Sequence, residues 1–359
     1  MSKNLQITLT TSLTLLEQFQ GAISSPIGDV TSAELSEKDA LPLLSASATT
    51  LKSQATKLSL VTITSPFTPS AVSTVLSAVN ESVLPSLVTA ALLVTPADHT
   101  KAFQTEVNVL VQTALKETAA LLQEVQVIAK KDEAQKKAGD LSQSEKDAVT
   151  VAAGRLWESC DALIDIATKG VIGFVIRRVE EWRDLVRDAV QEIEEWDPDE
   201  EGDEFFDELL SNDGKADDDS EEDENDEDTA AIHAQKKSAL RILKPVLQIY
   251  PAIIENRLKR TSNASAAVGK LESLMKELQQ IPGYVDEVAG TLYEANLEGS
   301  VQYLHKVKDC AVRAVDLVTL PWDGMVGSAD AQQDKEDRFT AWSRTWRKVM
   351  SEVSKSVSD

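Results

Sequence analysis

The chain has 359 residues and a mass of 39.1 kDa, and its 42% hydrophobic and 27% charged residues are typical of a globular protein with a buried core. The net charge is −24, and residues 197–228 contribute −18 of it, with 19 acidic side chains against one basic, Lys215. The remainder holds 41 acidic and 35 basic residues. This balance argues against nucleic acid as a direct partner, because phosphate contacts need clustered Lys and Arg.

Cysteine content and hydropathy indicate the kind of cellular compartment in which the protein is expected. Two cysteines, Cys160 and Cys310, are too few for a disulfide framework and fit a reducing compartment. The first 20 residues lack the basic start and unbroken apolar core of a signal peptide. No run of 18 apolar residues occurs, so we expect no membrane span and no membrane partner.

The first 24 residues fit two patterns. Leu5, Ile7 and Leu9 alternate as in a strand, whereas Leu5, Leu9 and Leu16 repeat as in a helix. Because no partner strand is evident elsewhere in the chain, we expect a helix.

Prolines mark the boundaries of the helices that follow. A helix is expected over residues 34–64, and another over Pro69–Val94, where Pro85 should kink or split it. A turn at residues 96–98 then leads into a helix over about 98–130, with Asp98 as the candidate N-cap.

The clearest helical pattern runs from Ile172 to Trp196, where apolar residues recur at spacings of three and four and charged residues fill the other face. It ends where Pro198 disfavours further helix. Gly170 and Gly173 mark a break from a preceding helix over 144–168. The residues of that helix expected to be buried are Val151, Leu156, Cys160, Leu163 and Ala167.

Residues 197–228 form an acidic run that we expect to be disordered, because like charges repel and little apolar surface compensates. The run is either a solvating spacer or a tether for basic partners, and its apolar pairs favour the tether. Ser220 precedes three acidic residues and is a candidate phosphosite. The candidate tether residues are Phe205, Phe206, Leu209 and Leu210.

Helical patterning resumes at about Ala230 and continues to Leu258, with bends at Pro245 and Pro251. Further helices are expected over 264–280, 283–295 and 297–319, and the last helix carries Phe339, Trp342, Trp346, Val349 and Val353. The sequence thus predicts an all-α fold of two helical bundles. These are an N-terminal bundle (1–196), an acidic disordered linker (197–228) and a C-terminal bundle (229–359). Alternatively, residues 144–196 are a spine shared by both bundles.

Groups that support catalysis or metal binding are scarce. The three histidines, His99, His233 and His305, have no second His or Cys at helical spacing, so no helix presents a zinc pair. We expect His99 to be exposed at a helix start, and the two cysteines to pack as small hydrophobic residues. The acidic run does not match a calcium-binding loop, and no nucleotide-binding or nucleophile motif occurs. We therefore predict no catalytic residue, no metal site and no cofactor.

Tryptophans near the C-terminus have two interpretations. Trp342 and Trp346, close to Arg344 and Arg347, suggest base stacking on nucleic acid. The two Trp share the apolar stripe while the basic residues lie elsewhere on the helix, so core packing is favoured.

Three segments resemble the cyclin-D-binding protein family, also called the GCIP or cyclin-D-interacting family. They are Gln54–Val61, Arg183–Pro198 with the acidic run after it, and Ile281–Ala289 continuing to Leu292 and Tyr293. The resemblance implies a non-enzymatic, all-helical regulator found in nucleus and cytoplasm. It implies D-type cyclins and helix-loop-helix transcription factors as partners. The rival hypothesis is a vinculin-like helical scaffold for the cytoskeleton or trafficking, which is an analogy of fold alone.

Overall fold

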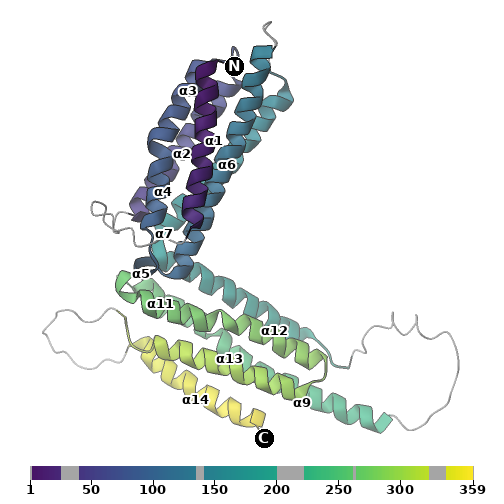
Figure 1. Ribbon diagram of the computed structural model, residues 1–359. Helices are drawn as coiled ribbons and strands as arrows, with labels where there is room; N and C mark the ends of the chain where they lie inside the picture. Colours follow the sequence, from purple (N-terminus) through teal and green to yellow (C-terminus); the bar gives the residue numbers. More distant parts are fainter. Residues whose placement is uncertain are drawn as a thin grey trace, which may run out of the picture. The chain divides into compact units, whose positions relative to one another are not determined.

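The structure is a computed structural model that describes residues 2–25, 40–134, 141–199, 222–261, 264–322 and 337–358. Helices make up all the regular elements in these ranges, and no strand occurs among them, which confirms the all-α prediction. They form two compact units, Met1–Phe174 and Val175–Asp359, which we call unit 1 and unit 2 (Figure 1).

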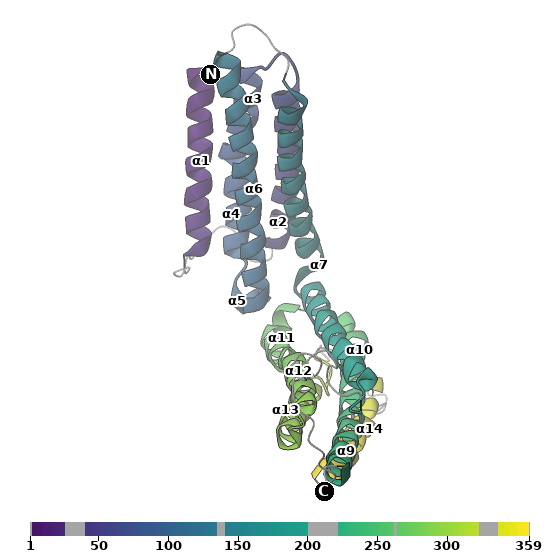
Figure 2. The same ribbon diagram turned by 90° about the vertical axis from the view of Figure 1, so that its right-hand side faces the viewer.

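Unit 1 is a bundle of long helices that lie side by side (Figure 2). Helices α6 and α7 are antiparallel, because Lys131 pairs with Glu145 at one end and Glu117 pairs with Arg155 further along. The helices of the unit are α1 (Lys3–Ser24), α2 (Ala40–Ile63), α3 (Pro69–Ala78), α4 (Leu84–Leu93), α5 (Pro96–His99), α6 (Lys101–Ala134) and the first part of α7 (Gln143–Glu195).

The structure of α1 decides between the strand and helix patterns of the first 24 residues. Leu5 and Leu9 are fully buried, whereas Ile7 between them is 66% exposed. A strand that buried Leu5 and Leu9 would also bury Ile7, since all three would point to one face. The helical interpretation of this segment is therefore confirmed.

The predicted break at Pro85 is also present. A π-helical turn, Val79–Val83, separates α3 from α4, and Pro85 lies in the first turn of α4. Proline has no N–H to give to the carbonyl four residues earlier, so the backbone cannot continue as a regular α-helix. The wider turn lets the N–H of Leu84 bond to the Val79 carbonyl instead.

The turn before α6 differs from the prediction. The N-cap is Thr100, whose hydroxyl accepts the Phe103 N–H at 3.2 Å, and not Asp98. Asp98 accepts the Thr95 hydroxyl at 2.6 Å inside the short helix α5. Thr100 adopts a positive φ of 72°, which ends α5 and redirects the chain into α6. Sequence alone does not show which polar residue of such a turn takes this conformation.

Helix α7 contains the predicted break and the boundary between the units. Gly170 has φ 63° and ψ −168°, a conformation that favours glycine. Unit 1 ends at Phe174, so α7 contributes residues to both compact units. The domain bounds given above, with the boundary at residue 196, stay a prediction. Val151, which we expected to be buried, is 58% exposed, and Val149 takes the core position.

A reciprocal capping box begins α7. One Glu145 carboxylate oxygen accepts the Ser142 backbone N–H at 2.8 Å and the Ser142 hydroxyl at 2.7 Å, and the other pairs with Lys131 at 2.7 Å. The hydrogen bonds from Lys131 and Ser142 lower the pKa of Glu145 to about 2. This end of α7 is thus anchored both to its own first turn and to α6.

We expect Glu145→Gln to lower the free energy of unfolding of unit 1 by about 1 kcal/mol at neutral pH. Because the pKa of Glu145 falls from 4.5 to about 2 in the folded chain, its stabilisation is complete above pH 4.5 and is lost as the pH drops toward 2. The free energy of unfolding, measured with urea between pH 2 and 7, should fall less steeply toward low pH for the variant than for the parent chain. Glu158→Gln, at an exposed position of the same helix, is the control; equal curves for the two variants would contradict the prediction.

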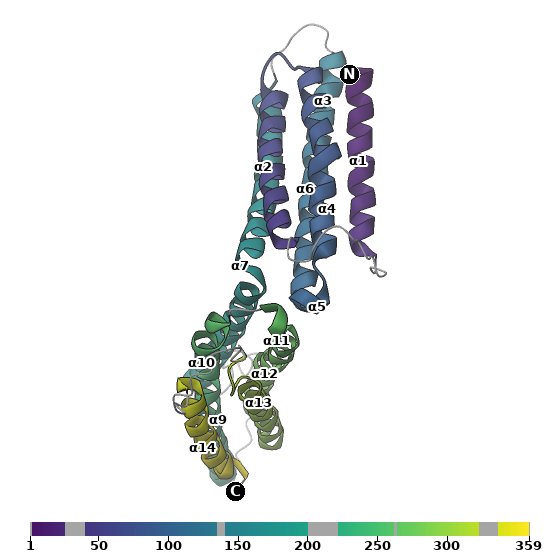
Figure 3. The ribbon, with the colours of Figure 1, turned by 90° about the vertical axis from the view of Figure 1, so that its left-hand side faces the viewer.

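Unit 2 is built around α13, which packs against α9, α11, α12 and α14. Figure 3 shows α11, α12 and α13 on one side of the unit and α9, α10 and α14 on the other. Helix α9 begins at Glu222, earlier than the predicted start near Ala230. Acidic residues in a first turn complement the helix dipole, which favours this earlier start. Besides the second part of α7, the helices are α9 (Glu222–Leu247), α10 (Ile249–Asn256), η3 (Leu258–Arg260), α11 (Ala264–Leu278), α12 (Gln280–Tyr293), α13 (Leu297–Leu317) and α14 (Arg338–Ser358).

The C-terminal helix α14 packs beside α9 and α10. Trp346 is buried, and its indole N–H donates to the Pro245 carbonyl at 2.9 Å, near the break between α9 and α10. This confirms core packing for Trp346, whereas Trp342 is half-buried against it. Val349, expected on the apolar stripe, is exposed, because the stripe drifts to Met350 as the helix proceeds.

One continuous helical stretch of the described chain, Pro69–Leu93, is long and apolar enough to cross a membrane by length and composition. In unit 1 it packs against α1, α2 and α6, and it buries Val72, Leu76 and Leu87. Core helices pass the same test of hydropathy, and this packing accounts for the apolar composition.

Candidate functional site

The histidine and the cysteine of unit 1, His99 and Cys160, are both buried. His99, which we expected to be exposed, is buried and stacks on Phe103 with ring centroids 5.8 Å apart. Burial lowers the pKa of His99, against the opposing effects of Asp98 and the Thr95 backbone. Cys160 is fully buried, as predicted, and burial raises the pKa of its thiol to about 12. Neither residue is available to a substrate in this conformation.

We expect Cys160 and Cys310 to resist alkylation by iodoacetamide at pH 8 in the native chain, because the thiolate is the reactive form and burial raises both pKa values. Mass spectrometry of the labelled protein should show full modification in urea and almost none without it. Rapid native labelling of Cys160 would mean that a solvent path reaches it, and would reopen the question of a nucleophilic role.

The candidate tether residues and the candidate phosphosite lie outside the described residues. They are Phe205, Phe206, Leu209, Leu210 and Ser220. Their roles therefore remain predictions from the sequence.

Basic side chains cluster on one face of α9 in unit 2, and the sequence analysis did not identify this cluster. An open hollow of about 580 Å³ lies along this face of the helix. Its lining contains no acidic residue, although the chain as a whole carries a charge of −24. The lining residues, which we call the α9 basic stripe, are His233, Lys236, Lys237, Leu240, Arg241 and Lys244.

The end of α7 neutralises part of this stripe. Lys244 pairs with Glu194 at 2.7 Å, and the Lys236 ammonium donates to the backbone carbonyls of Glu194 and Trp196. A lysine at carbonyls left free by a helix terminus is favourable, since it supplies donors and complements the dipole. These contacts fix the path of the chain from Glu194 to Trp196 along α9.

Aromatic packing holds the same end of α7 against α12. The ring of Trp196 meets Tyr293 edge to face with centroids 4.8 Å apart, and the Tyr293 hydroxyl donates to Glu192 at 3.2 Å. Burial and the Glu192 carboxylate raise the pKa of Tyr293 to about 12. Trp196 and Tyr293 both belong to segments that carry the family resemblance, and the fold brings them together.

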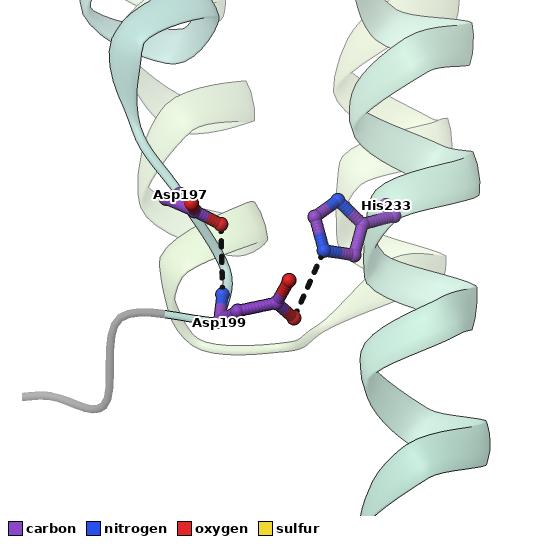
Figure 4. A group of neighbouring side chains, drawn as sticks. All are labelled: Asp197, Asp199 and His233. Atoms are coloured by element: carbon purple, nitrogen blue, oxygen red, sulfur yellow. Dashed lines mark hydrogen bonds and ion pairs between the residues drawn. The ribbon is translucent and has the colours of Figure 1, made fainter.

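Just beyond this contact, Asp197, Asp199 and His233 form a small exposed cluster (Figure 4). Their potential ligand atoms lie within 4.8 Å of one another, which is close enough for a shared cation. Asp199 contacts the His233 ring nitrogen at 3.0 Å, and Asp197 accepts the Asp199 backbone N–H at 3.0 Å. These hydrogen bonds account for the arrangement, and the neighbouring lysines of the stripe disfavour a cation. The cluster therefore serves to hold residues 197–199 against α9.

The fold and this surface define a class of protein: an all-helical bundle protein whose candidate site is a charged, exposed helix face suited to contacts with another macromolecule. Residues 43–199 match the family model described as Grap2 and cyclin-D-interacting, N-terminal. The match contains two of the three segments named above and ends at Asp199, beside the α9 basic stripe. Over these residues the chain is similar to the N-terminal domain of that family, which confirms the predicted resemblance for this part of the chain. No curated protein matches the chain.

Proposed function

We propose that the chain is a non-enzymatic regulator of cell-cycle progression and transcription, which binds D-type cyclins and helix-loop-helix factors through helical surfaces in nucleus and cytoplasm. The match of residues 43–199 to a cyclin-D-interacting family is the observation that carries this proposal. The burial of both cysteines and of one of the three histidines, His99, supports the non-enzymatic part, because it closes these nucleophilic and acid–base groups to a substrate in this conformation.

The acidic run contributes to the same proposal. In it, Phe205, Phe206, Leu209 and Leu210 tether a partner, and phosphorylation of Ser220 tunes that contact. A phosphate adds about −1.5 to −2 to a segment that already carries −18, so it adjusts binding by a modest amount and does not act as a switch.

Affinity purification from the source cells tests the proposal. The tagged full chain should recover a D-type cyclin or a helix-loop-helix factor from both nuclear and cytoplasmic fractions. A chain in which residues 200–221 are replaced by a neutral Gly/Ser segment of equal length should recover less, because it lacks the tether residues. Recovery of neither partner class above background would contradict the proposal.

The rival function, a vinculin-like scaffold, draws support from the long antiparallel helices of unit 1. Cosedimentation of the purified chain with actin filaments separates the two functions. Saturable sedimentation with filaments, together with no cyclin recovery, would favour the scaffold. Sedimentation at the level of a globular control protein would leave the regulator as the better account.

A further inference from the structure

We propose that the α9 basic stripe is a docking site for an acidic, leucine-containing segment of a partner protein. The proposal rests on the proposed function only in that the partner is a protein. It names a surface and a partner chemistry that the family match does not supply.

Lys237 and Arg241 are the centre of the stripe. Both side chains are exposed and lie one helical turn apart, and neither forms an ion pair within the described part of the chain. Lys236 and Lys244 flank them and are already engaged by the end of α7. The unneutralised positive charge is therefore concentrated at two neighbouring positions, with the half-buried Leu240 between them.

The composition of α9 concentrates this charge further. From Thr229 to Ile254 the sequence contains no acidic residue, and its basic residues are Lys236, Lys237, Arg241 and Lys244. From His233 to Lys244 the stripe spans ~16 Å, at 1.5 Å per helical residue. An acidic segment of about three helical turns covers this length, and Leu240 offers its apolar residues a contact in the hollow.

Nucleic acid fits this surface less well than a peptide. A duplex presents a charge about every 1.7 Å along its axis and needs an extended basic track. Here Glu194, Asp197 and Asp199 border the stripe directly, as their contacts with Lys244 and His233 show. A duplex long enough to gain affinity would meet these carboxylates, whereas a short peptide segment avoids them.

The acidic segment of this chain, residues 200–221, is the competing occupant. From Glu194 at Lys244 to Asp199 at His233, the chain runs along α9 toward its start, and the contacts among the described residues leave Lys237 and Arg241 without an ion pair. The binding experiment therefore includes a protein that separates this occupant from a partner segment.

Fluorescence anisotropy with a labelled peptide tests the proposal. The probe is a peptide of about twelve residues with the repeat Glu-Leu-Glu-Glu, long enough to span the stripe as a helix. The proteins are the full chain, a Lys237→Glu/Arg241→Glu variant, and a Lys270→Glu/Lys276→Glu variant. The last makes the same charge change at exposed positions of α11 and is the matched control. Circular dichroism checks that each variant retains its helices.

We expect the full chain to bind the peptide and the stripe variant to bind it at least ~10-fold more weakly. The control variant should bind as tightly as the full chain. The reason is that charges act over a short distance at physiological salt, where the Debye length is ~8 Å. Equal weakening in both variants would show a net-charge effect and overturn the proposal. Tighter binding of a 20-base-pair duplex than of the peptide would also overturn it.

A fourth protein tests the competing occupant. In it, residues 200–221 are replaced by a Gly/Ser segment of equal length. If the peptide binds only this protein, the chain's own segment occupies the stripe, and the proposal of a partner segment is overturned. If neither protein binds, the stripe is not an acidic-peptide site. Cyclin binding, measured separately on the full chain, tests the proposed function and does not depend on these results.

Discussion

Replacing Arg257 by Ala is expected to lower the free energy of unfolding of unit 2 by about 3–5 kcal/mol, the range for breaking a buried ion pair. The Arg257 side chain is 5% exposed and donates to the backbone carbonyls of Val318 at 2.6 Å and Thr319 at 2.9 Å. It also pairs with Asp337 at 2.9 Å and lies over the ring of Phe339, 4.5 Å from its centroid. It thus joins the end of α10 to the end of α13 and the start of α14. Its loss leaves the buried Val318 carbonyl without this donor and removes one donor each from the part-buried Thr319 carbonyl and Asp337 carboxylate.

Tryptophan fluorescence during urea unfolding measures this effect, since five of the six tryptophans lie in unit 2. Arg313→Ala is the control: that side chain is 53% exposed and pairs with Glu277 at 2.8 Å, and such surface pairs contribute less than about 1 kcal/mol. A loss for Arg257→Ala no larger than that for Arg313→Ala would show that the contacts around Arg257 do not hold α14 in place.

Phe103→Ala is expected to destabilise unit 1 by about 3–5 kcal/mol, as for other buried aromatic residues. Phe103 is fully buried, stacks on His99, and meets Phe174 edge to face with centroids 5.5 Å apart. The substitution leaves a cavity under the turn from α5 to α6 and removes both ring contacts. Hydrogen exchange followed by mass spectrometry should show faster exchange in α5 and α6, with unit 2 unchanged.

Two further variants give a lower range of destabilisation with which Phe103→Ala is compared. Phe103→Leu keeps most of the volume and should cost about 1 kcal/mol. Ile7→Ala, at an exposed position of α1, should fall within about 0.5 kcal/mol of the parent chain. If Phe103→Ala is no more destabilising than Ile7→Ala, the ring does not occupy the core position assigned to it.

The helices were predictable wherever one face alone carries apolar residues. Val175, Val179, Val186 and Ile193 follow the expected spacing in α7, and all four are buried. Prediction failed where apolar residues lie on opposite faces of one helix: Val149 and Val151 are two positions apart in α7, so only one of them can face the core, and the sequence does not decide which. Pro85 and Gly170 were informative because each imposes a backbone constraint that does not depend on the rest of the fold.

The candidate site depends on contacts between distant residues, which the sequence does not display. Nothing local to Glu194 indicates that it pairs with Lys244, or that Trp196 packs on Tyr293. The α9 basic stripe did leave a signal, namely the acid-free stretch from Thr229 to Ile254 that follows the most acidic part of the chain. A local measure of charge, in place of the net charge, would have found it.

We propose that this chain acts by binding a D-type cyclin. Isothermal titration of the purified full chain with a purified D-type cyclin tests the proposal, with a cyclin of another class as the control. We expect saturable binding at a defined stoichiometry to the D-type cyclin and none to the control. Heats no larger than dilution for both cyclins, from a chain that circular dichroism shows to be folded, would contradict it.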